Sequence, residues 1–298
     1  MGETLLNIRG LKTYFYTASG VVRAVDGVSF QLEKGKTMGI VGESGSGKSV
    51  TANSIIRLLP PAGKIVDGEI TFDGKEMMSL SQKELQQMRG SDIAMIFQDP
   101  MTSLDPVFRV GDQMVEMIRE HNKSLTHKEA WDMSLKALHE VGIPSPEKRM
   151  KSNPHELSGG MCQRVIIAMA VCCKPKLLIA DEPTTALDVT VQAQVLDLMS
   201  ELQKNHDTAI LLVTHNLGVI WKMADSVMVM YAGNTVEYAD TKTLYQNPLH
   251  PYTWGLLDSM PTLSGDSSKD LNTIHGTPPD LRLTGTCCNF YNRCKYAS

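Results

Sequence analysis

The sequence predicts an α/β protein in which a glycine-rich loop joins a buried strand to a helix. An apolar strand-like run over residues 37–41 leads into that loop, and a helical pattern begins at Lys48 and continues toward Leu59. Three further short apolar runs, residues 93–97, 177–180 and 209–213, end in polar residues. A chain of 298 residues can bury a proper core, in one or two domains.

The loop from Gly42 to Ser49 fits the pattern G-x-x-x-x-G-K-[ST] in full. Such a loop points backbone N–H groups inward, and the helix behind it adds its positive end, so a triphosphate is the natural occupant. A chance match in a chain of this length is on the order of one in a hundred. Lys48 is expected to reach the β- and γ-phosphates, and the Ser49 hydroxyl to ligate Mg²⁺. The predicted contact residues are consecutive: Gly42, Glu43, Ser44, Gly45, Ser46, Gly47, Lys48, Ser49 and Val50.

Composition narrows the function classes. A formal charge of −4 and a pI near 6.1 argue against a nucleic-acid binder that relies on bulk basicity. The strongest apolar run, residues 165–173, is far shorter than the roughly 20 residues of a membrane-spanning helix. The N-terminal residues lack the pattern of a secretion signal. We therefore expect a cytoplasmic protein whose six cysteines are thiols or metal ligands.

Residues 5–30 predict two strands around a turn at residues 17–20. Tyr14, Phe15 and Tyr16 crowd the end of the first strand, and since side chains alternate, at least one should face outward and be able to stack on a base. Packing of an edge-strand aromatic on its neighbours is an equally good explanation. A strand over residues 68–73 and a short helix over residues 81–89 follow.

Residues from 110 to about 171 change to a mostly helical pattern, with a capping box at Thr126 and Glu129. This region ends in the segment Leu157-Ser158-Gly159-Gly160-Met161-Cys162-Gln163-Arg164. Ser158 is a good N-cap, and the two glycines leave backbone N–H groups open for an anion. By itself, Ser-Gly-Gly before a helix is a weak signal and usually only a cap.

Two carboxylates, Asp181 and Glu182, follow the apolar run at residues 177–180. In a chain with a phosphate-binding loop, this pair suggests a Mg²⁺ ligand, Asp181, beside a base, Glu182, that polarises the attacking water. Gln98 and His215 follow two other buried strands, and polar residues at such strand ends are well placed for nucleotide contact. We expect His215 to contact the γ-phosphate.

The remaining segments predict a hairpin over residues 227–238 and a helix over residues 250–260. A polar connector follows over residues 264–280.

The order of these motifs, with Leu187-Asp188 after Glu182, resembles the ATP-binding-cassette family over about residues 5–245. The resemblance implies a P-loop NTPase core with an antiparallel β subdomain (residues 1–97 and 176–245), a helical subdomain (98–175) and a C-terminal extension (246–298). It implies a head-to-tail dimer, with each ATP between one subunit's P-loop and the partner's Ser158-Gly159-Gly160 segment.

The resemblance also assigns residue roles. Phe15 is the implied adenine-stacking residue, with Tyr14 or Tyr16 as substitutes. Gln98 is implied to bind Mg²⁺ and the attacking water, so that Mg²⁺ has Ser49, Gln98 and Asp181 as its ligands. Gln163 and Asp188 join the implied nucleotide site, and catalysis falls to Glu182, His215, Gln98 and Lys48.

Within this family, residues 98–106 and 250–257 resemble the oligopeptide/dipeptide importer ATPases, in which two non-identical ATPases usually pair. Met101-Thr102 is similar to one of the two subunit types. The implied function is ATP-driven uptake of di- and oligopeptides from the cytoplasmic face of the membrane. The implied partners are a second ATPase subunit, identical or not, two transmembrane permease subunits and, indirectly, an extracellular or periplasmic peptide-binding protein; no nucleic acid is implied.

Several alternatives stay open. The ATPase of a nickel or other small-solute importer and an export ATPase share every catalytic motif. A cassette ATPase acting on ribosomes or DNA is disfavoured, because neither a second cassette nor a long coiled-coil insertion is visible. A regulator without catalysis is disfavoured because Glu182 and His215 are both present.

Peptide-importer ATPases of this type can carry a four-cysteine [4Fe–4S] site in the tail. Cys288 and Cys294 match its first two positions, and Cys287 is a candidate substitute ligand. The sequence ends at Ser298 without completing a Cys₄ set. A truncated motif, oxidisable thiols and a partial metal site are the alternatives.

Overall fold

The computed structural model describes residues 2–98, 103–185, 187–260, 273–283 and 287–297. The chain forms two compact units: Met1–Ser79 with Leu212–Ser298, and Leu80–Leu211. The range of the predicted helical subdomain, 98–175, falls in the second unit, together with residues 80–97 and 176–211 of the predicted nucleotide-binding core. The range of the predicted C-terminal extension falls in the first unit. The prediction for Met101-Thr102 and most of the predicted connector at 264–280 fall outside the described residues.

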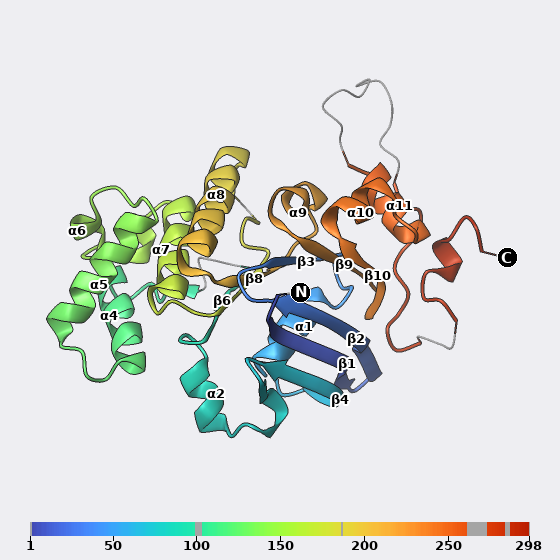
Figure 1. Ribbon diagram of the computed structural model, residues 1–298, viewed down its shortest axis with the longest axis horizontal. Coiled ribbons are helices and arrows are strands. Elements are labelled where there is room, and N and C mark those ends of the chain that lie inside the picture. The colour runs from blue at the N-terminus through green and yellow to red at the C-terminus, as the bar shows by residue number, and fades with distance from the viewer. Residues whose placement is uncertain (1, 99–102, 186, 261–272, 284–286, 298) are drawn as a thin grey trace. The chain divides into compact units, whose positions relative to one another are not determined.

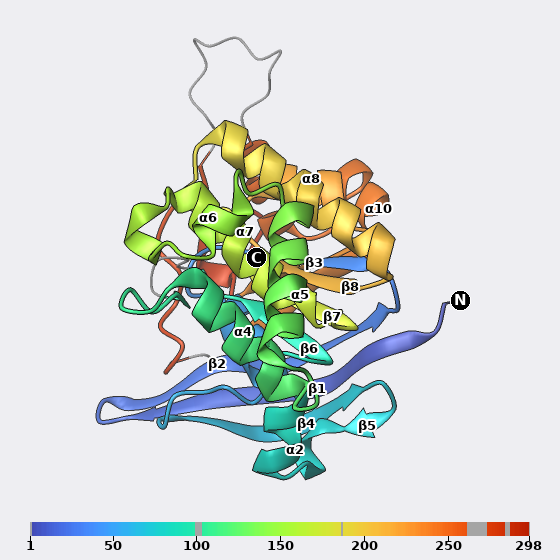
Figure 2. The same ribbon diagram turned by 90° about the vertical axis from the view of Figure 1, so that its left-hand side faces the viewer.

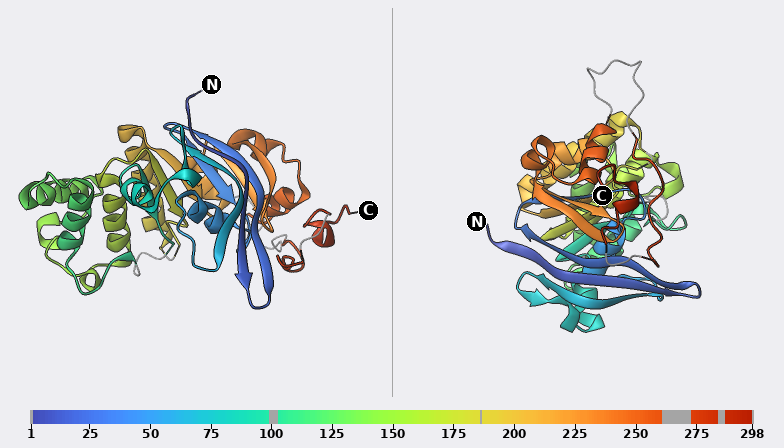
Figure 3. Two further views of the ribbon diagram at one scale, coloured as in Figure 1. Left: turned by 90° about the horizontal axis from the view of Figure 1, so that it is seen from below. Right: turned by 90° about the vertical axis from the view of Figure 1, so that its right-hand side faces the viewer.

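The first unit contains a four-stranded antiparallel sheet in the order β2-β1-β4-β5. Its strands are β1 (Thr4–Thr17), β2 (Gly20–Glu33), β4 (Gly63–Phe72) and β5 (Lys75–Glu76). β1 and β2 form a long hairpin that reaches the pair Thr17↔Gly20, and Figures 2 and 3 show its length. The predicted turn at residues 17–20 is therefore confirmed.

The first unit also contains the strand that leads into the P-loop. All five residues of β3 (Thr37–Val41) are buried, and β3 pairs in parallel with β9 (Ser226–Tyr231). The Thr214 N–H donates to the Ile40 carbonyl over 3.1 Å, which places the end of β8 (Ala209–Val213) beside β3. β3 therefore has a neighbouring strand at each edge, and the burial of all five of its residues explains its largely apolar sequence.

β9 continues antiparallel into β10 (Asn234–Asp240), which confirms the predicted hairpin. Its two turn residues, Ala232 and Gly233, both have positive φ, 47° and 83°. Two such residues in a row are what a tight hairpin turn with the right twist requires.

The helix behind the P-loop is shorter than predicted: α1 spans Lys48–Ile55 and does not reach Leu59. Arg57 takes a φ of 52°, which a continuing right-handed helix excludes, and its Nη1 donates to the Met77 carbonyl over 3.1 Å. This contact lies in another part of the chain, so local periodicity did not reveal the end of the helix.

Among its described residues, the first unit has three further helices, all in its C-terminal segment: α9 (Leu217–Met223), α10 (Thr241–Gln246) and α11 (Pro251–Asp258). Short 3₁₀ turns lie at Met77–Ser79 and at Tyr291–Arg293. The ring of Tyr231 at the end of β9 lies 4.6 Å from Tyr252 of α11 and 5.2 Å from Phe290 of the tail. These three rings join the tail to the core of the unit.

The second unit pairs two parallel strands, β6 (Ile93–Ile96) and β7 (Leu177–Asp181). The Ala209 N–H donates to the Lys176 carbonyl over 2.9 Å, which places the start of β8 beside β7. Its helices are α2 (Gln82–Met88), α4 (Val110–His121), α5 (His127–Glu140), α6 (Pro146–Arg149), α7 (Gly159–Cys172) and α8 (Val189–His206), with a 3₁₀ turn at Pro154–Glu156. Figure 1 shows α4 to α7 as neighbours.

The helix starts of the second unit follow local capping chemistry. Thr126 and Glu129 form the predicted capping box at α5, and Ser81 and Glu84 form another at α2. Because each box satisfies the free N–H groups of a first turn, these starts are fixed by residues three apart. None of the described helices is both long enough and apolar enough to span a membrane.

Candidate functional site

The backbone of the P-loop requires glycine at two positions. Gly42 and Gly47 have φ of 154° and 102°. A Cβ at Gly42 would lie 2.2 Å from the Met230 carbonyl oxygen, and one at Gly47 would lie 2.3 Å from that of Ala24. Any larger residue at either position would therefore have to move backbone, which explains two of the glycines in the motif.

The chemistry of the loop suits an anionic ligand. Lys48 is 5% exposed, and its Nζ donates to the carbonyls of Gly42 and Glu43 over 2.8 and 2.9 Å. The buried Ser46 hydroxyl has no hydrogen-bond partner among the described residues. α1 begins after Gly47 without a side-chain cap, so the N–H groups of its first turn can donate hydrogen bonds to an anion. A buried cation, an unsatisfied hydroxyl and an uncapped helix start fit a phosphate group.

His215 lies in the same unit as the P-loop. It is exposed and follows β8, whose end is beside β3. His215 therefore follows a strand whose end lies beside the strand that leads into the P-loop. Its contact with a γ-phosphate stays a prediction.

The three aromatic residues of β1 differ in their surroundings. The Tyr14 hydroxyl donates to Asp26 Oδ1 over 2.8 Å, and Tyr16 is 50% exposed. Phe15 pairs with Gly63 of β4, and its ring would lie 2.9 Å from a Cβ at that glycine. The identity of the adenine-stacking residue stays a prediction.

In the second unit, two of the predicted catalytic residues are in contact. Gln98 Nε2 donates to Glu182 Oε2 over 3.4 Å, because β6 and β7 are parallel and end side by side. The hydroxyl of Thr185 donates to the same oxygen over 2.8 Å. Thr185 was not among the residues predicted from the sequence. The only sequence feature that points to it is a hydroxyl-bearing residue three positions after Glu182. Glu182 is thus held by two donors, and its neighbour Asp181 is buried at 5% exposed.

The Ser158-Gly159-Gly160 segment opens α7 as predicted. The Ser158 hydroxyl accepts from the Met161 N–H over 3.3 Å. A Cβ at Gly159 would meet nothing within 4 Å, so that face is open, whereas one at Gly160 would lie 2.9 Å from Val191 Cγ1. Among the other predicted nucleotide residues, Asp188 caps α8 by accepting from the Val191 N–H over 2.9 Å. Gln163 is buried at 1% exposed.

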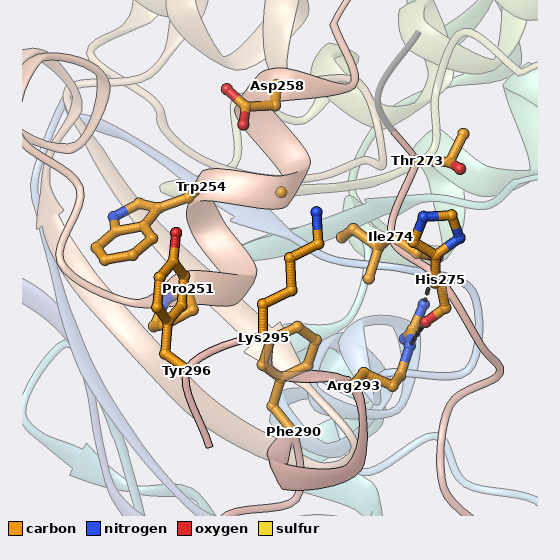
Figure 4. Close-up of a pocket in the computed structure, with 11 residues that line it drawn as sticks. Pro251, Trp254, Asp258, Thr273, Ile274, His275, Phe290, Arg293, Lys295 and Tyr296 are labelled. Carbon is orange, nitrogen blue, oxygen red and sulfur yellow. Dashed lines mark hydrogen bonds between the residues drawn. The ribbon is translucent and has the colours of Figure 1, made fainter. Parts of the chain in front are cut away.

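Two cavities of the first unit lie near the C-terminal segment. One, of about 160 Å³, is lined by P-loop residues 43–46 and by tail residues that include Pro278 and Leu281. The other, of about 210 Å³, lies between α11 and the end of the tail and is shown in Figure 4. No P-loop residue lines the second cavity.

The residues predicted to bind Mg²⁺ and those predicted to bind an iron–sulfur cluster differ in how well they suit the metal. Ser49, Gln98 and Asp181 offer hydroxyl, amide and carboxylate oxygens, the hard donors that Mg²⁺ prefers. For the tail, no group of three or more His, Cys, Asp or Glu side chains is placed to hold a metal ion in the part of the chain that the structure describes. Cys287, Cys288 and Cys294 are described there as free thiols, so as placed they do not fit an iron–sulfur cluster.

Comparison with known proteins gives family matches for two stretches of the chain. Residues 25–185 match the family described as ABC transporter, and residues 236–298 match the family described as Oligopeptide/dipeptide transporter, C-terminal region. The oligopeptide transport ATP-binding protein OppD of Bacillus subtilis is 55% identical over 93% of this chain and 77% of its own length. The dipeptide transport ATP-binding protein DppD of the same organism is 51% identical over 98% of this chain and 87% of its own length.

Solved structures support the fold. The ATP-binding cassette MJ0796, in a dimeric post-hydrolysis state bound to ADP and Pi, has a TM-score of 0.72 at 24% identity and covers 80% of this chain and 99% of its own. The cbiO1 protein of Clostridium perfringens, part of the ABC transporter complex cbiONQ, has a TM-score of 0.69 at 28% identity and covers 82% of this chain and 92% of its own. With its P-loop cradle and both family matches, the chain belongs to the ABC transporter ATPases and is similar along almost its whole length to oligopeptide and dipeptide transport ATP-binding proteins.

Proposed function

We propose that this ABC ATPase couples ATP binding and hydrolysis to the uptake of di- and oligopeptides through separate membrane subunits. The observation that carries the proposal is one chain combining a glycine-built phosphate cradle with 55% identity to an oligopeptide transport ATP-binding protein. The match of residues 236–298 to a peptide-transporter C-terminal region supports peptides over nickel or other small solutes, and import over export.

In the proposed reaction, water attacks the γ-phosphorus of ATP, the β–γ bridging P–O bond breaks, and ADP and phosphate leave. Lys48 and the loop amides hold the β- and γ-phosphates. Glu182 orients the water and takes its proton, while Gln98 and Thr185 fix the carboxylate through the hydrogen bonds they donate. His215 contacts the γ-phosphate. When bound through Ser49, Gln98 and Asp181, Mg²⁺ would neutralise charge on the phosphate oxygens.

The remaining nucleotide contacts belong to the proposed dimer. The Ser158-Gly159-Gly160 segment, with Gln163 and Asp188 behind it, contacts the ATP held by a partner ATPase, and an aromatic residue of β1 stacks on adenine. ATP then closes the dimer, and loss of the γ-phosphate opens it. The predicted helical subdomain carries this motion to two permease subunits, at the cytoplasmic face of the membrane. No step of the proposal passes through the tail cysteines.

A reconstituted complex tests the transport proposal. The chain is assembled with its candidate permease subunits and a second ATPase subunit in proteoliposomes, together with a peptide-binding protein. ATP hydrolysis and uptake of a labelled tripeptide are then measured. We expect the peptide to stimulate both, and the Lys48→Ala variant to abolish both. Stimulation by Ni²⁺ instead of peptide, or peptide movement in the export direction, would refute the peptide-import proposal.

A further inference from the structure

Glu43 of the P-loop forms an ion pair with Arg293, which lies 250 residues later in the C-terminal tail. Nη1 and Nη2 of Arg293 donate to the two carboxylate oxygens of Glu43 over 2.7 and 3.0 Å. The side chain of Arg293 is 6% exposed and that of Glu43 is 28% exposed. A two-point contact between a guanidinium and a carboxylate is among the stronger polar interactions in proteins, and this one is largely shielded from water.

The guanidinium of Arg293 is fixed on its other edges as well. Nε donates to the His275 carbonyl over 2.9 Å, as Figure 4 shows, and Nη1 also donates to the Tyr231 hydroxyl over 3.2 Å. The guanidinium carbon lies 5.7 Å from the centre of the Tyr231 ring. Because these contacts leave the Arg293 guanidinium little freedom to move, the Glu43 carboxylate that it binds is also fixed in position. The hydrogen bond to Glu43 also raises the pKa of Arg293, so the guanidinium stays charged.

The backbone of Glu43 is held by a second residue of the extension. Its N–H donates to the hydroxyl of Tyr252 in α11 over 2.8 Å. Burial raises the pKa of this phenol, so it remains neutral and able to accept the bond. The extension therefore holds Glu43 at its amide and at both carboxylate oxygens.

The same residue helps to hold the phosphate-binding lysine. The carbonyl of Glu43 accepts from Lys48 Nζ over 2.9 Å and from the Ser46 N–H over 3.2 Å. A shift of Glu43 would therefore move an anchor of the Lys48 ammonium and change the curvature of the loop. Glu43 therefore connects the tail to the P-loop, and its side chain does not have to contact the phosphates to do so.

We propose that Arg293 is a positioning residue for nucleotide binding, which acts through Glu43 and makes the shape of the P-loop depend on the docked C-terminal tail. The inference rests on the proposed nucleotide-binding role of this loop. It assigns to the tail a control over ATP affinity that is independent of any metal cluster. A tail that undocks would release Glu43 and weaken ATP binding without altering the catalytic carboxylate.

A brace that only stabilised the fold would behave differently. It would lower the unfolding temperature when broken, but the folded fraction would still bind ATP with unchanged affinity. The two explanations therefore separate on nucleotide affinity measured on folded protein.

The test measures the Kd of a fluorescent ATP analogue, and the kcat and KM of ATP hydrolysis, at a temperature where every variant is folded. Arg293→Ala is expected to raise both Kd and KM by about tenfold, with a smaller effect on kcat. Arg293→Lys keeps the charge but loses the two-point fork, so an intermediate effect is expected. Glu43→Gln should match Arg293→Ala, and the double variant should be no weaker than either single variant.

Arg282→Ala is the matched control. Arg282 lies in the same extension and forms an ion pair with Asp280, but its side chain is 41% exposed and no described bond joins it to the P-loop. Its removal should leave Kd and KM within about twofold of the wild-type values, as expected of an exposed pair.

Two negative results can be told apart. Unchanged Kd and KM in both Arg293→Ala and Glu43→Gln, with binding still lost in Lys48→Ala, would overturn the positioning role and leave the ATPase proposal intact. Wild-type protein that binds no ATP, or binding unaffected by Lys48→Ala, would overturn the proposed function itself. If Arg293→Ala does not fold, Arg293→Lys and Glu43→Gln decide the question by the same measurement.

Discussion

Glu182 has a φ of 47°, in the left-handed region that residues other than glycine rarely occupy. Such a conformation costs on the order of 1 kcal/mol and persists only where neighbouring contacts impose it. The carboxylate of Glu182 accepts hydrogen bonds from the hydroxyl of Thr185 and the amide of Gln98. A carboxylate fixed in this way is suited to orient one water molecule, which is the role proposed for Glu182.

Replacing the carboxylate by an amide tests this role directly. Glu182→Gln keeps the size of the side chain but removes the proton acceptor, so kcat should fall about 100-fold or more while ATP affinity is kept. Phosphate release and binding of a fluorescent ATP analogue measure the two effects. Glu201→Gln, at an exposed position of α8, is the control and should hydrolyse ATP normally. Robust turnover by Glu182→Gln would exclude Glu182 as the base.

At the scale of elements, the helices of the second unit depend on local caps and on close helix contacts. Thr126 accepts from the Glu129 N–H, and the Glu129 carboxylate accepts from the N–H and hydroxyl of Thr126. α7 approaches α8 closely at Gly160, where no Cβ stands between the helix and Val191. The first device fixes where a helix starts, and the second fixes how near its neighbour can come.

The capping box at α5 gives a stability prediction. Thr126→Ala should lower the free energy of unfolding by about 1 kcal/mol, whereas Thr126→Ser should retain the cap. The hydrogen bonds from Thr126 lower the pKa of Glu129, so its contribution is present at neutral pH and is lost as the pH falls through the acidic range. Urea unfolding at pH 7 and pH 3 measures both effects. An equal difference between wild type and Thr126→Ala at the two pH values would contradict the part assigned to Glu129.

The two glycines at the start of α7 form a matched pair. Gly160→Ala would place a Cβ 2.9 Å from the stiff side chain of Val191, so its unfolding temperature should fall. Gly159→Ala meets nothing within 4 Å and should match or exceed the wild-type value. Thermal unfolding of the two variants measures this difference. The prediction fails if Gly160→Ala is the more stable of the two.

At the scale of the whole molecule, the proposed activity depends on a second subunit. The open face at Gly159 and the exposed cap at Ser158 lie at the start of α7, where a partner's nucleotide would bind. The Ser158 hydroxyl caps α7 by accepting from the Met161 N–H, and a Cβ at Gly159 would meet nothing within 4 Å. The proposed dimer gives this segment its purpose.

Association driven by ATP tests the dimer. In the Glu182→Gln background, ATP should be held without hydrolysis, and light scattering should detect a dimer with either an identical or the native partner subunit. Adding Ser158→Arg places a bulky side chain at the proposed contact, so the dimer should be lost although ATP still binds to the P-loop. An unchanged dimer in the double variant would remove the role of Ser158 across the interface.

Much of the site could be predicted because its signals are local. A strand followed by the glycine loop, polar residues at strand ends and caps three residues apart all depend on neighbours in sequence. The glycine-rich P-loop and the capping box at Thr126 followed from these patterns, whereas the hydrogen bond between Gln98 and Glu182 was seen only in the structure. The end of α1 was missed, since Arg57 is held by a carbonyl 20 residues away.

The sequence alone determined the fold class, the phosphate cradle and the order of the catalytic motifs, because spacing and periodicity carry this information. Only the tertiary structure showed that the tail cysteines are not grouped for a metal among the described residues, and that Arg293 holds Glu43 across 250 positions. Such contacts join segments that are far apart in the chain, so no periodic pattern in the sequence reveals them. They form because folding brings distant side chains together once the local elements have packed.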